Sequence, residues 1–349
     1  MSRIEFDCIG VQSLKLDNVH RDIEFARDVE SKGFTSFWTA EPGLGRDGVS
    51  QIGALSQATD EIVLATGILP IWTRNVAMMA QTWATLYELA GPRVRCGLGL
   101  WYEPLASRCG VDRSDPNPLR AAWEYSTVLR RLLDGETVTY DGQYLDVEAI
   151  ELDVLYGERD GTEAVPIYLA ATGPQMNTMV GELVGNGVVE GCVLNCYIPP
   201  NYAEECISKL HEGIRKQDGD TSALDLPELI LVSMQDDADK AYDAARPRVT
   251  AYMGQQPHIA RACGAPDDLI ETVKAQLGED YPPDSEALAR AAEHVPDEQV
   301  ERMVCVGTPE SVVEQVYEYI EVGVTEPVLT RVSGDPDRIV DTFAEYLQA

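Results

Sequence analysis

Lysine is scarce in this chain, and basic residues as a group are outnumbered. Only six lysines occur among 349 residues, and 27 basic residues stand against 59 acidic ones, a formal net charge of -32. Nucleic acids and anionic membranes are bound by clustered lysine and arginine that neutralise phosphate groups. The composition therefore argues against both kinds of partner.

Long apolar runs and metal-binding spacings are also missing. No segment approaches the roughly 20 apolar residues of a membrane span, and the N-terminal MSRIEFDCIG is too polar for a secretory signal. We therefore expect a cytoplasmic protein that does not bind a membrane. The eight cysteines form no C-x-x-C pair, and the four histidines are scattered. This pattern predicts free thiols and no metal site.

A repeated alternation of strand-like and helix-like segments is what the chain does have. Alternating units of this kind imply parallel strands, and eight of them favour closure into a barrel over an open sheet. We therefore predict an α/β fold, a (β/α)8 TIM barrel with insertions. The expected strands are Asp7–Gln12, Ser36–Thr39, Ile62–Gly67, Val94–Leu98, Ile167–Ala170, Val188–Leu194, Leu229–Val232 and Pro327–Thr330.

The length of the chain is ordinary for one elaborated barrel, and no linker or shift in composition divides it. Residues 1–349 are therefore expected to form a single domain. A polar, helix-prone insertion at about 255–302 lies between the seventh and eighth expected strands. Asp141-Gly142 predicts a hairpin turn near 137–147, and Thr308-Pro309 predicts the start of a helix.

The most specific pattern lies between Leu64 and Leu100, where the sequence is LATGILPIWTRNVAMMAQTWATLYELAGPRVRCGLGL. This stretch resembles the bacterial luciferase-like superfamily in three successive parts. They are T-G-(I/V)-x-P-x-x-T-R, a helix that ends A-T-L-x-E-L-x-G-x-R, and G-(L/I)-G. Within this superfamily, the pattern resembles the deazaflavin (F420)-dependent methylene-tetrahydromethanopterin reductases. The resemblance is collinear from about Phe6 to Tyr346. The acidic excess with few lysines is typical of a halophile's surface, so we expect a halophilic archaeal member.

This resemblance implies an oxidoreductase that uses coenzyme F420. The reduced coenzyme would deliver hydride to methylene-tetrahydrofolate or methylene-tetrahydromethanopterin and give the methyl form; the sequence does not separate these two pterins. It also implies a homo-oligomer, a dimer or a tetramer. Two alternatives stay open. One keeps the fold but acts as an FMN-dependent monooxygenase, or as an F420-dependent dehydrogenase of another small molecule. The other is a non-catalytic member that only binds a flavin.

The expected coenzyme site lies at the C-terminal ends of the strands, where barrel active sites assemble. Relatives carry a non-prolyl cis bond, in a bulge behind the flat ring, at the step matching Gly67-Ile68. They also carry a Gly-Pro step that contacts the coenzyme, and this matches Gly173-Pro174. That step opens a helix whose free amides suit a phosphate. The resemblance therefore assigns the coenzyme to Thr66, Gly67, Ile68, Gly99, Tyr102, Thr172, Gly173, Pro174 and Gln175.

Three polar residues at strand ends are the candidates for catalysis: Gln12, Glu41 and Glu103. Relatives place a glutamate at position 12, where it serves the pterin nitrogen, but an amide cannot act as an acid. Relatives place Asp-His where this chain has Glu41-Pro42, so the acid is kept in kind. Tyr102 takes the place of another family acid, and Glu103 is one residue beyond it. Glu41, Glu103 or water is therefore expected to supply the proton, or the substrate differs.

The loop after the second expected strand, from Gly43 to Gly48, is a literal G-x-G-x-x-G. A dinucleotide fold would need a helix that opens within the motif and an acid about 20 residues later. The next helix is instead expected near Ser50, so we interpret the motif as a barrel loop. Arg74 follows the proposed bulge and is expected either to steady a loop or to contact an anion.

Overall fold

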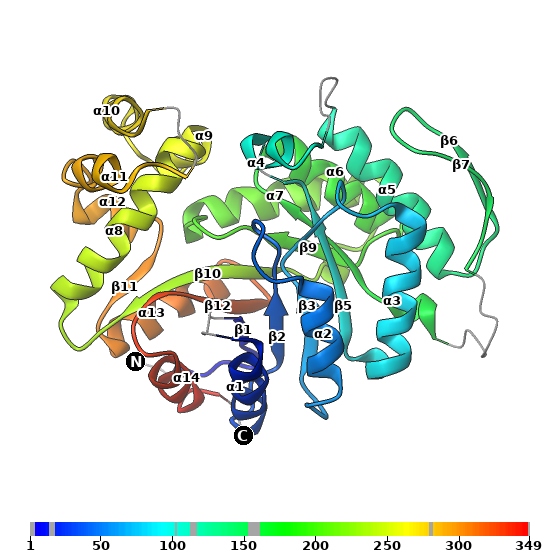
Figure 1. The fold of residues 1–349 in the computed structure, drawn as a ribbon, viewed down its shortest axis with the longest axis horizontal. Coiled ribbons are helices and arrows are strands. Elements are labelled where there is room, and N and C mark those ends of the chain that lie inside the picture. Colours follow the sequence, from blue (N-terminus) through cyan, green and yellow to red (C-terminus); the bar gives the residue numbers. More distant parts are fainter. Residues whose placement is uncertain are drawn as a thin grey trace.

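The chain folds as a closed parallel barrel. A computed structural model describes residues 4–13, 18–101, 103–111, 117–152, 161–278 and 282–347. In ring order the strands are β1 (Gly10–Gln12), β2 (Ser36–Thr39), β3 (Val63–Thr66), β5 (Val94–Gly99), β8 (Ile167–Ala171), β9 (Gly191–Leu194), β10 (Pro227–Met234) and β12 (Glu326–Ser333). β12 pairs with β1 and closes the ring (Figure 1). The predicted TIM barrel and its eight strands are confirmed.

A helix follows each barrel strand, as predicted. These helices are α1 (Val19–Ser31), α2 (Gly48–Ser56), α3 (Val76–Ala90), α5 (Pro118–Leu133), α6 (Pro174–Gly185), α7 (Pro200–Lys216), α8 (Ala238–Gln255) and α14 (Pro336–Ala344). Two further helices are α4 (Glu103–Arg108) and α13 (Pro309–Glu321). The predicted cap of α13 is present, because the Thr308 side chain accepts a hydrogen bond from the Ser311 amide. α2 begins at Gly48 rather than near Ser50, because Asp47 caps it.

Among the described residues, four short strands lie outside the ring. β4 (Leu69–Pro70) pairs with β5, and β11 (Cys305–Gly307), which the sequence did not predict, pairs with β10. β6 (Val138–Asp141) and β7 (Asp146–Ile150) form the predicted hairpin. Buried Glu124 of α5 holds that hairpin by accepting hydrogen bonds from the amides of residues 143–145. Burial opposes the charge, but these amides and Arg120 keep the pKa of Glu124 below its usual range.

The helix-prone insertion contains α9 (Pro257–Ala262), α10 (Asp267–Leu277), α11 (Ser285–Ala292) and α12 (Asp297–Glu301). With α8 these helices pack into a second apolar cluster, which also includes Leu231 of β10 and Val306 of β11; the helices lie at the upper left of Figure 1. Tyr197, just after β9, stacks on Tyr252 of α8 with ring centroids 3.6 Å apart. This aromatic pair attaches the insertion to the ends of the barrel strands.

Two buried glutamates on neighbouring strands have opposite surroundings. Glu326 of β12 accepts hydrogen bonds from Thr35 at 2.6 Å, Ser36 at 2.8 Å and Arg95 at 2.6 Å. Glu228 of β10 lies beside Pro327 in register, and among the described residues neither of its carboxylate oxygens has a hydrogen-bond partner. Burial raises the pKa of Glu228 well above its usual range.

Helices α6 and α7 are in contact at the backbone. A Cβ atom added to Gly181 would lie 2.1 Å from the carbonyl oxygen of Leu210. One added to Gly213 would lie 2.0 Å from the carbonyl oxygen of Thr178. No side chain fits at either position without moving a helix, so the two glycines set the spacing of this helix pair.

The described residues also bear on membrane spans, metal sites and disulfides. Within the described residues, no helix is both long and apolar enough to cross a membrane. No group of three or more His, Cys, Asp or Glu side chains in this part of the chain is placed to hold a metal ion. All eight cysteines are free thiols.

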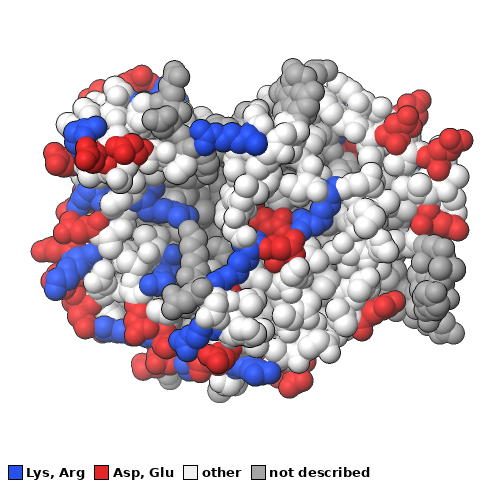
Figure 2. Space-filling model, in the orientation of Figure 1, with Lys and Arg blue, Asp and Glu red and all other residues white. Residues whose placement is uncertain are grey.

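Charge is unevenly distributed over the surface. On the face shown in Figure 2, acidic side chains gather over the helical insertion and near the β6–β7 hairpin, whereas the area over α2 and α3 is largely uncharged. The sequences agree with this view, because α2 has no charged residue and α3 has only Glu88.

The net charge of -32 leads to a prediction about salt. Molar KCl shortens the screening length from about 10 Å at 0.1 M to about 3 Å, which relieves self-repulsion in the folded state. We expect the melting temperature to rise by on the order of 5–10 °C over that range. Scanning calorimetry measures it, with sucrose as a non-ionic control. A flat or falling melting temperature in KCl would contradict the expectation of a halophilic protein.

Candidate active site

The bulge predicted at the end of the third barrel strand is present. The Gly67-Ile68 peptide bond is cis, the Gly67 amide donates to the Thr39 carbonyl at 2.7 Å, and the Glu41 amide donates to the Ile68 carbonyl at 3.1 Å. A Cβ on Gly67 would lie 3.1 Å from the Trp38 ring. A side chain at position 67 would therefore crowd Trp38 and Leu229 where the ends of β2 and β3 meet.

The neighbouring strand meets the same bulge. A Cβ atom on Gly99 would lie 2.8 Å from the Ile68 side chain and 3.3 Å from Ala170. Thr66 accepts from the Gly97 amide at 2.9 Å and donates to its carbonyl at 2.8 Å. Four of the residues expected to contact the coenzyme, Thr66, Gly67, Ile68 and Gly99, are thus brought together at one place on the barrel rim.

Gln12 reaches this bulge from β1. Its side-chain amide Nε2 lies 3.1 Å from the Gly67 carbonyl oxygen. Its Oε1 accepts a hydrogen bond of 3.2 Å from the hydroxyl of Thr330, at the C-terminal half of β12. Both ends of the Gln12 amide therefore have partners within the protein.

The carboxylate of Glu41 forms an ion pair with an arginine. The two guanidinium nitrogens of Arg74 each lie 2.8 Å from one Glu41 oxygen, and the Gly48 amide donates to the carboxylate at 2.9 Å. Arg74 also pairs with Asp47 at 2.7 Å. The hydrogen bonds to Glu41 raise the pKa of Arg74. Of the two roles considered for Arg74, the structure places it in loop support, since it joins both ends of residues 41–48.

The loop that contains the G-x-G-x-x-G motif is held on a second side. Arg46 forms an ion pair with buried Asp22 of α1, and Gln51 donates to the same carboxylate at 2.9 Å. The tip between these supports projects outward, with the Leu44 side chain 83% exposed. α2 starts only at the last glycine of the motif, which agrees with a barrel loop and not with a dinucleotide fingerprint.

Trp101 covers the inner side of this loop. Its indole nitrogen donates to the Glu41 carbonyl at 2.8 Å, and its ring packs with Trp72 and Leu105. Two of the expected site residues follow it in the chain. Tyr102 lies outside the described residues, and for Glu103, which begins α4, only the backbone is described.

The predicted helix start after β8 is also present. α6 begins at Pro174, and the cap residue Gly173 offers no side chain to its amides. The Tyr202 hydroxyl donates to the Thr172 carbonyl at 2.7 Å and fixes the turn. Pro174 and Gln175 are exposed, and a Cβ on Gly173 would meet no atom within 4 Å. The first amides of α6 are therefore open to an anion.

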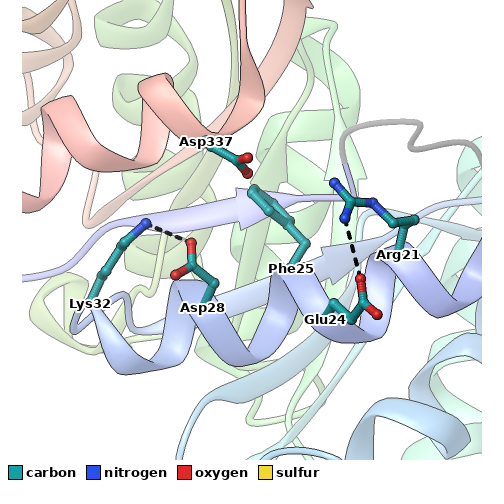
Figure 3. A pocket seen from close by; sticks show the side chains of 6 residues that line it. All are labelled: Arg21, Glu24, Phe25, Asp28, Lys32 and Asp337. Carbon is teal, nitrogen blue, oxygen red and sulfur yellow. Dashed lines mark hydrogen bonds and ion pairs between the residues drawn. The ribbon is translucent and has the colours of Figure 1, made fainter.

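A cavity elsewhere in the molecule is separate from this candidate site. It measures about 310 Å³ and lies between α1 and α14. Figure 3 shows that four of its charged side chains form two ion pairs, Lys32 with Asp28 and Arg21 with Glu24. None of its residues lies at the C-terminal end of a barrel strand, so it takes no part in the candidate site. Its lining consists of Arg21, Glu24, Phe25, Asp28, Lys32 and Asp337.

Comparison with known proteins decides the family. The model of the luciferase-like monooxygenase family matches residues 5–326. The chain belongs to this family.

Relatives within the family are named for more than one activity. The chain is 28% identical to a 5,10-methylenetetrahydromethanopterin reductase of Methanolobus tindarius, over 91% of this chain and 92% of the relative. It is also 28% identical to an F420-dependent glucose-6-phosphate dehydrogenase of Beutenbergia cavernae, over 89% and 84%. The solved structure of the coenzyme F420 dependent tetrahydromethanopterin reductase from Methanopyrus kandleri superposes with a TM-score of 0.83, at 21% identity and 99% coverage of both chains.

Three residues that support the candidate site were not predicted from the sequence. Thr330, Asp22 and Arg46 support the rim. Thr330 and Asp22 belong to no motif, and Arg46 lies in the glycine motif of residues 43–48, where its ion pair could not be foreseen. Thr330 could have been noticed because it stands near the end of the last barrel strand, where family sites assemble. Asp22 had no such signal, because a buried acid in an amphipathic helix looks like any other acid in the sequence.

Proposed function

We propose that this protein is an oxidoreductase that uses coenzyme F420 to reduce a one-carbon tetrahydropterin from the methylene to the methyl form. The acceptor is methylene-tetrahydromethanopterin or methylene-tetrahydrofolate, which share the reacting end of the pterin. Relatives named as F420-dependent enzymes match about nine-tenths of the chain, and they support this class of coenzyme.

One observation carries the proposal. The Gly67-Ile68 bulge, the side-chain-free position Gly99 and the uncapped start of α6 lie at the ends of neighbouring strands of one barrel. The first two leave a flat wall suited to a planar ring, and the third offers backbone amides to an anionic tail. In a chain with a charge of -32, such local donors are needed to hold an anion against the overall field.

The residues at the rim fit the coenzyme, and each group of them has a separate role. The bound coenzyme, when reduced, supplies a hydride and a proton. The amides at the start of α6 hold its phosphate, and the bulge supports its ring. Glu41 and Arg74 keep the loop of residues 41–48 over the rim. The protein thereby aligns donor and acceptor carbons and keeps water out.

Opening the methylene bridge places a proton on a pterin nitrogen, while the hydride goes to the methylene carbon. Gln12 cannot give a proton, and we assign it a hydrogen-bonding role. The carboxylate of Glu41 is engaged by Arg74 on both oxygens, so we assign it to loop support. The proposed proton source is therefore Glu103 or a water molecule.

A binding titration tests the coenzyme assignment. We expect micromolar affinity for F420, and at least about 100-fold weaker binding of FMN and NADPH, a difference of about 2.7 kcal/mol. Fluorescence quenching of each coenzyme in molar KCl measures the affinities side by side. Micromolar binding of FMN without binding of F420 would overturn the proposal and support a flavin-dependent monooxygenase.

A second candidate is an F420-dependent dehydrogenase of another small molecule. It is favoured by the relatives named as F420-dependent glucose-6-phosphate dehydrogenases. Oxidation of the reduced coenzyme by either methylene-pterin supports the first candidate. Reduction of the oxidised coenzyme by glucose 6-phosphate, or by an alcohol, with no reaction of the pterins supports the second.

We also propose that the protein forms a homo-oligomer. Helix α2 has no charged residue and α3 has only Glu88, so together they form a face on which two such acidic chains would meet with little repulsion. Met78 and Leu89 of α3 are two of the large apolar side chains that this chain exposes. Sedimentation velocity in molar KCl distinguishes monomer, dimer and tetramer.

A further inference from the structure

The floor of the barrel mouth extends from the bulge after β3 toward the opposite strands. One residue from each of six strands meets in a single apolar cluster, which can form only inside the ring: Trp38, Ala65, Tyr168, Val193, Leu229 and Val328. Ala170 and Cys196 pack on this cluster nearer the C-terminal rim. A Cβ on Gly99 would touch both Ala170, at 3.3 Å, and Ile68 of the bulge, at 2.8 Å. The floor therefore continues from the bulge through Ala170 to Cys196.

Helix α8 and the helices of the insertion cover the far side of this mouth. β10 lies opposite β3 in the ring, and its Leu231 points inward like Leu229, two residues earlier. Leu231 belongs to the apolar cluster of these helices, and so does Tyr197, just after β9. Cys196 packs against both that cluster and the barrel interior. The insertion and the barrel interior therefore meet at Cys196, across the mouth from the bulge.

Tyr197 has a backbone conformation that a residue with a side chain rarely adopts, because its φ is 74°. Such a conformation costs free energy and persists only where the surrounding contacts impose it. The ring stacks on Tyr252 at 3.6 Å, the hydroxyl accepts from Nε of Arg248 at 2.7 Å, and the carbonyl accepts from the Cys263 thiol at 3.1 Å. Tyr252 and Arg248 belong to α8, and Cys263 follows α9. The path of the chain after β9 is therefore imposed by α8 and the insertion.

The same contacts fix the two residues that precede Tyr197. Asn195 is the first residue after β9, and its side-chain amide donates to the Tyr252 hydroxyl at 3.1 Å. The Cys196 thiol lies 3.5 Å from the side-chain oxygen of Asn195. Asn195 and Cys196 thus stand at the mouth in positions that Tyr197 and Tyr252 set from both sides.

A planar ring supported by the bulge turns its other face toward β9 and β10. A second substrate that exchanges hydride with this ring must then lie between the ring and these strand ends. We infer that Tyr197 and Tyr252 are positioning residues for the second substrate: their stack places Asn195 and Cys196 as the wall that this substrate contacts. The inference rests on the proposed function, because it takes the bulge as the support of the coenzyme ring.

Steady-state kinetics and coenzyme titration together test the inference. Tyr252→Leu removes the stack and the hydroxyl that Asn195 contacts, and should raise KM for the methylene-pterin about tenfold or more. We expect kcat within about threefold and the F420 dissociation constant within about twofold of wild type, because only uniform binding of the second substrate is lost. Tyr252→Phe keeps the stack and should recover most of the loss, with KM about threefold above wild type. Oxidation of the reduced coenzyme and fluorescence titration, both at fixed KCl, give these constants.

Ile270 of α10 supplies the matched control. It is buried in the same apolar cluster, but α10 lies at the outer end of the insertion in Figure 1. Ile270→Val should lower the melting temperature and leave KM at its wild-type value. An unchanged KM in Tyr252→Leu, an equal loss of F420 affinity, or the same rise of KM in Ile270→Val would overturn the inference. If Tyr252→Leu does not fold by circular dichroism, a wild-type KM in Tyr252→Phe overturns it.

Failure of the proposed function gives a different result in the wild type. Reaction with glucose 6-phosphate or an alcohol, and with neither pterin, overturns the pterin assignment, and the same variants assayed on that substrate still decide the role of the stack. A wild type that binds FMN and not F420, or that reacts with none of these substrates, overturns both.

Discussion

Replacing Glu228 with methionine should stabilise the protein, by about 1–4 kcal/mol in the free energy of unfolding. The carboxyl is buried, and among the described residues it has no hydrogen-bond partner. A methionine of similar volume removes a polar group that gains nothing from the fold. Chemical denaturation in molar KCl measures the change.

The gain should grow with pH. Burial raises the pKa of Glu228 in the folded state, whereas an unfolded glutamate titrates near 4.3. Above about pH 4.3 the unfolded state is stabilised by ionisation and the folded state is not, so the wild type loses stability as pH rises toward the folded pKa. Glu228→Met lacks this loss. A variant less stable than wild type at pH 8.5 would contradict the prediction.

Glu326→Met is the matched control, and it should do the opposite. Glu326 is equally buried, but it accepts from Thr35 and Ser36 and pairs with Arg95. Its loss leaves the guanidinium of Arg95 without its carboxylate inside the barrel, a change that costs about 3–5 kcal/mol. The same substitution on neighbouring strands thus separates a partnered from an unpartnered carboxyl.

Glu41→Gln should weaken coenzyme binding by about tenfold or more and leave single-turnover hydride transfer within about threefold of wild type. The physical reason is the loss of the charge-assisted pair with Arg74, which holds residues 41–48 in place. Were Glu41 the general acid, turnover would instead fall by about 10²–10⁴-fold with affinity little changed. Stopped-flow bleaching of the reduced coenzyme on adding methylene-pterin measures the rate.

Arg74→Met controls for the ion pair. It removes the other partner, so it should give the same loss of affinity, and the double variant should be no worse than either single one. Additive losses would mean that the two residues act separately. A rate loss confined to Glu41→Gln would restore that residue to acid catalysis.

Much of the fold was predictable because barrel strands are buried on both faces and stand out as apolar, β-branched runs. β11 was not predicted, because it has only three residues and pairs outside the ring. Helix starts were predictable where a cap and a proline coincide, as at Thr308. The N-cap of α2, Asp47, was not predicted, because it lies inside a glycine motif that is typical of dinucleotide binding.

The site was only partly predictable, for a physical reason. The bulge and the Gly-Pro helix start were expected from the family pattern, since each is a local feature of a few residues. The partners of Gln12 and Glu41 come from the closure of the barrel. Thr330 is 318 residues from Gln12, and Arg74 is 33 residues from Glu41. Spacing along the chain carries no sign of such contacts.

The backbone contact between α6 and α7 has a consequence for how the site can change. Because Gly181 and Gly213 leave no room for a side chain, a larger residue at either position would push α6 away from α7 and displace the start of α6. Changes to the proposed anion-binding end of α6 are therefore better made at residues 172–175, away from the two glycines. Directed evolution of coenzyme preference should accordingly concentrate its diversity on those four positions and leave the helix pair unaltered.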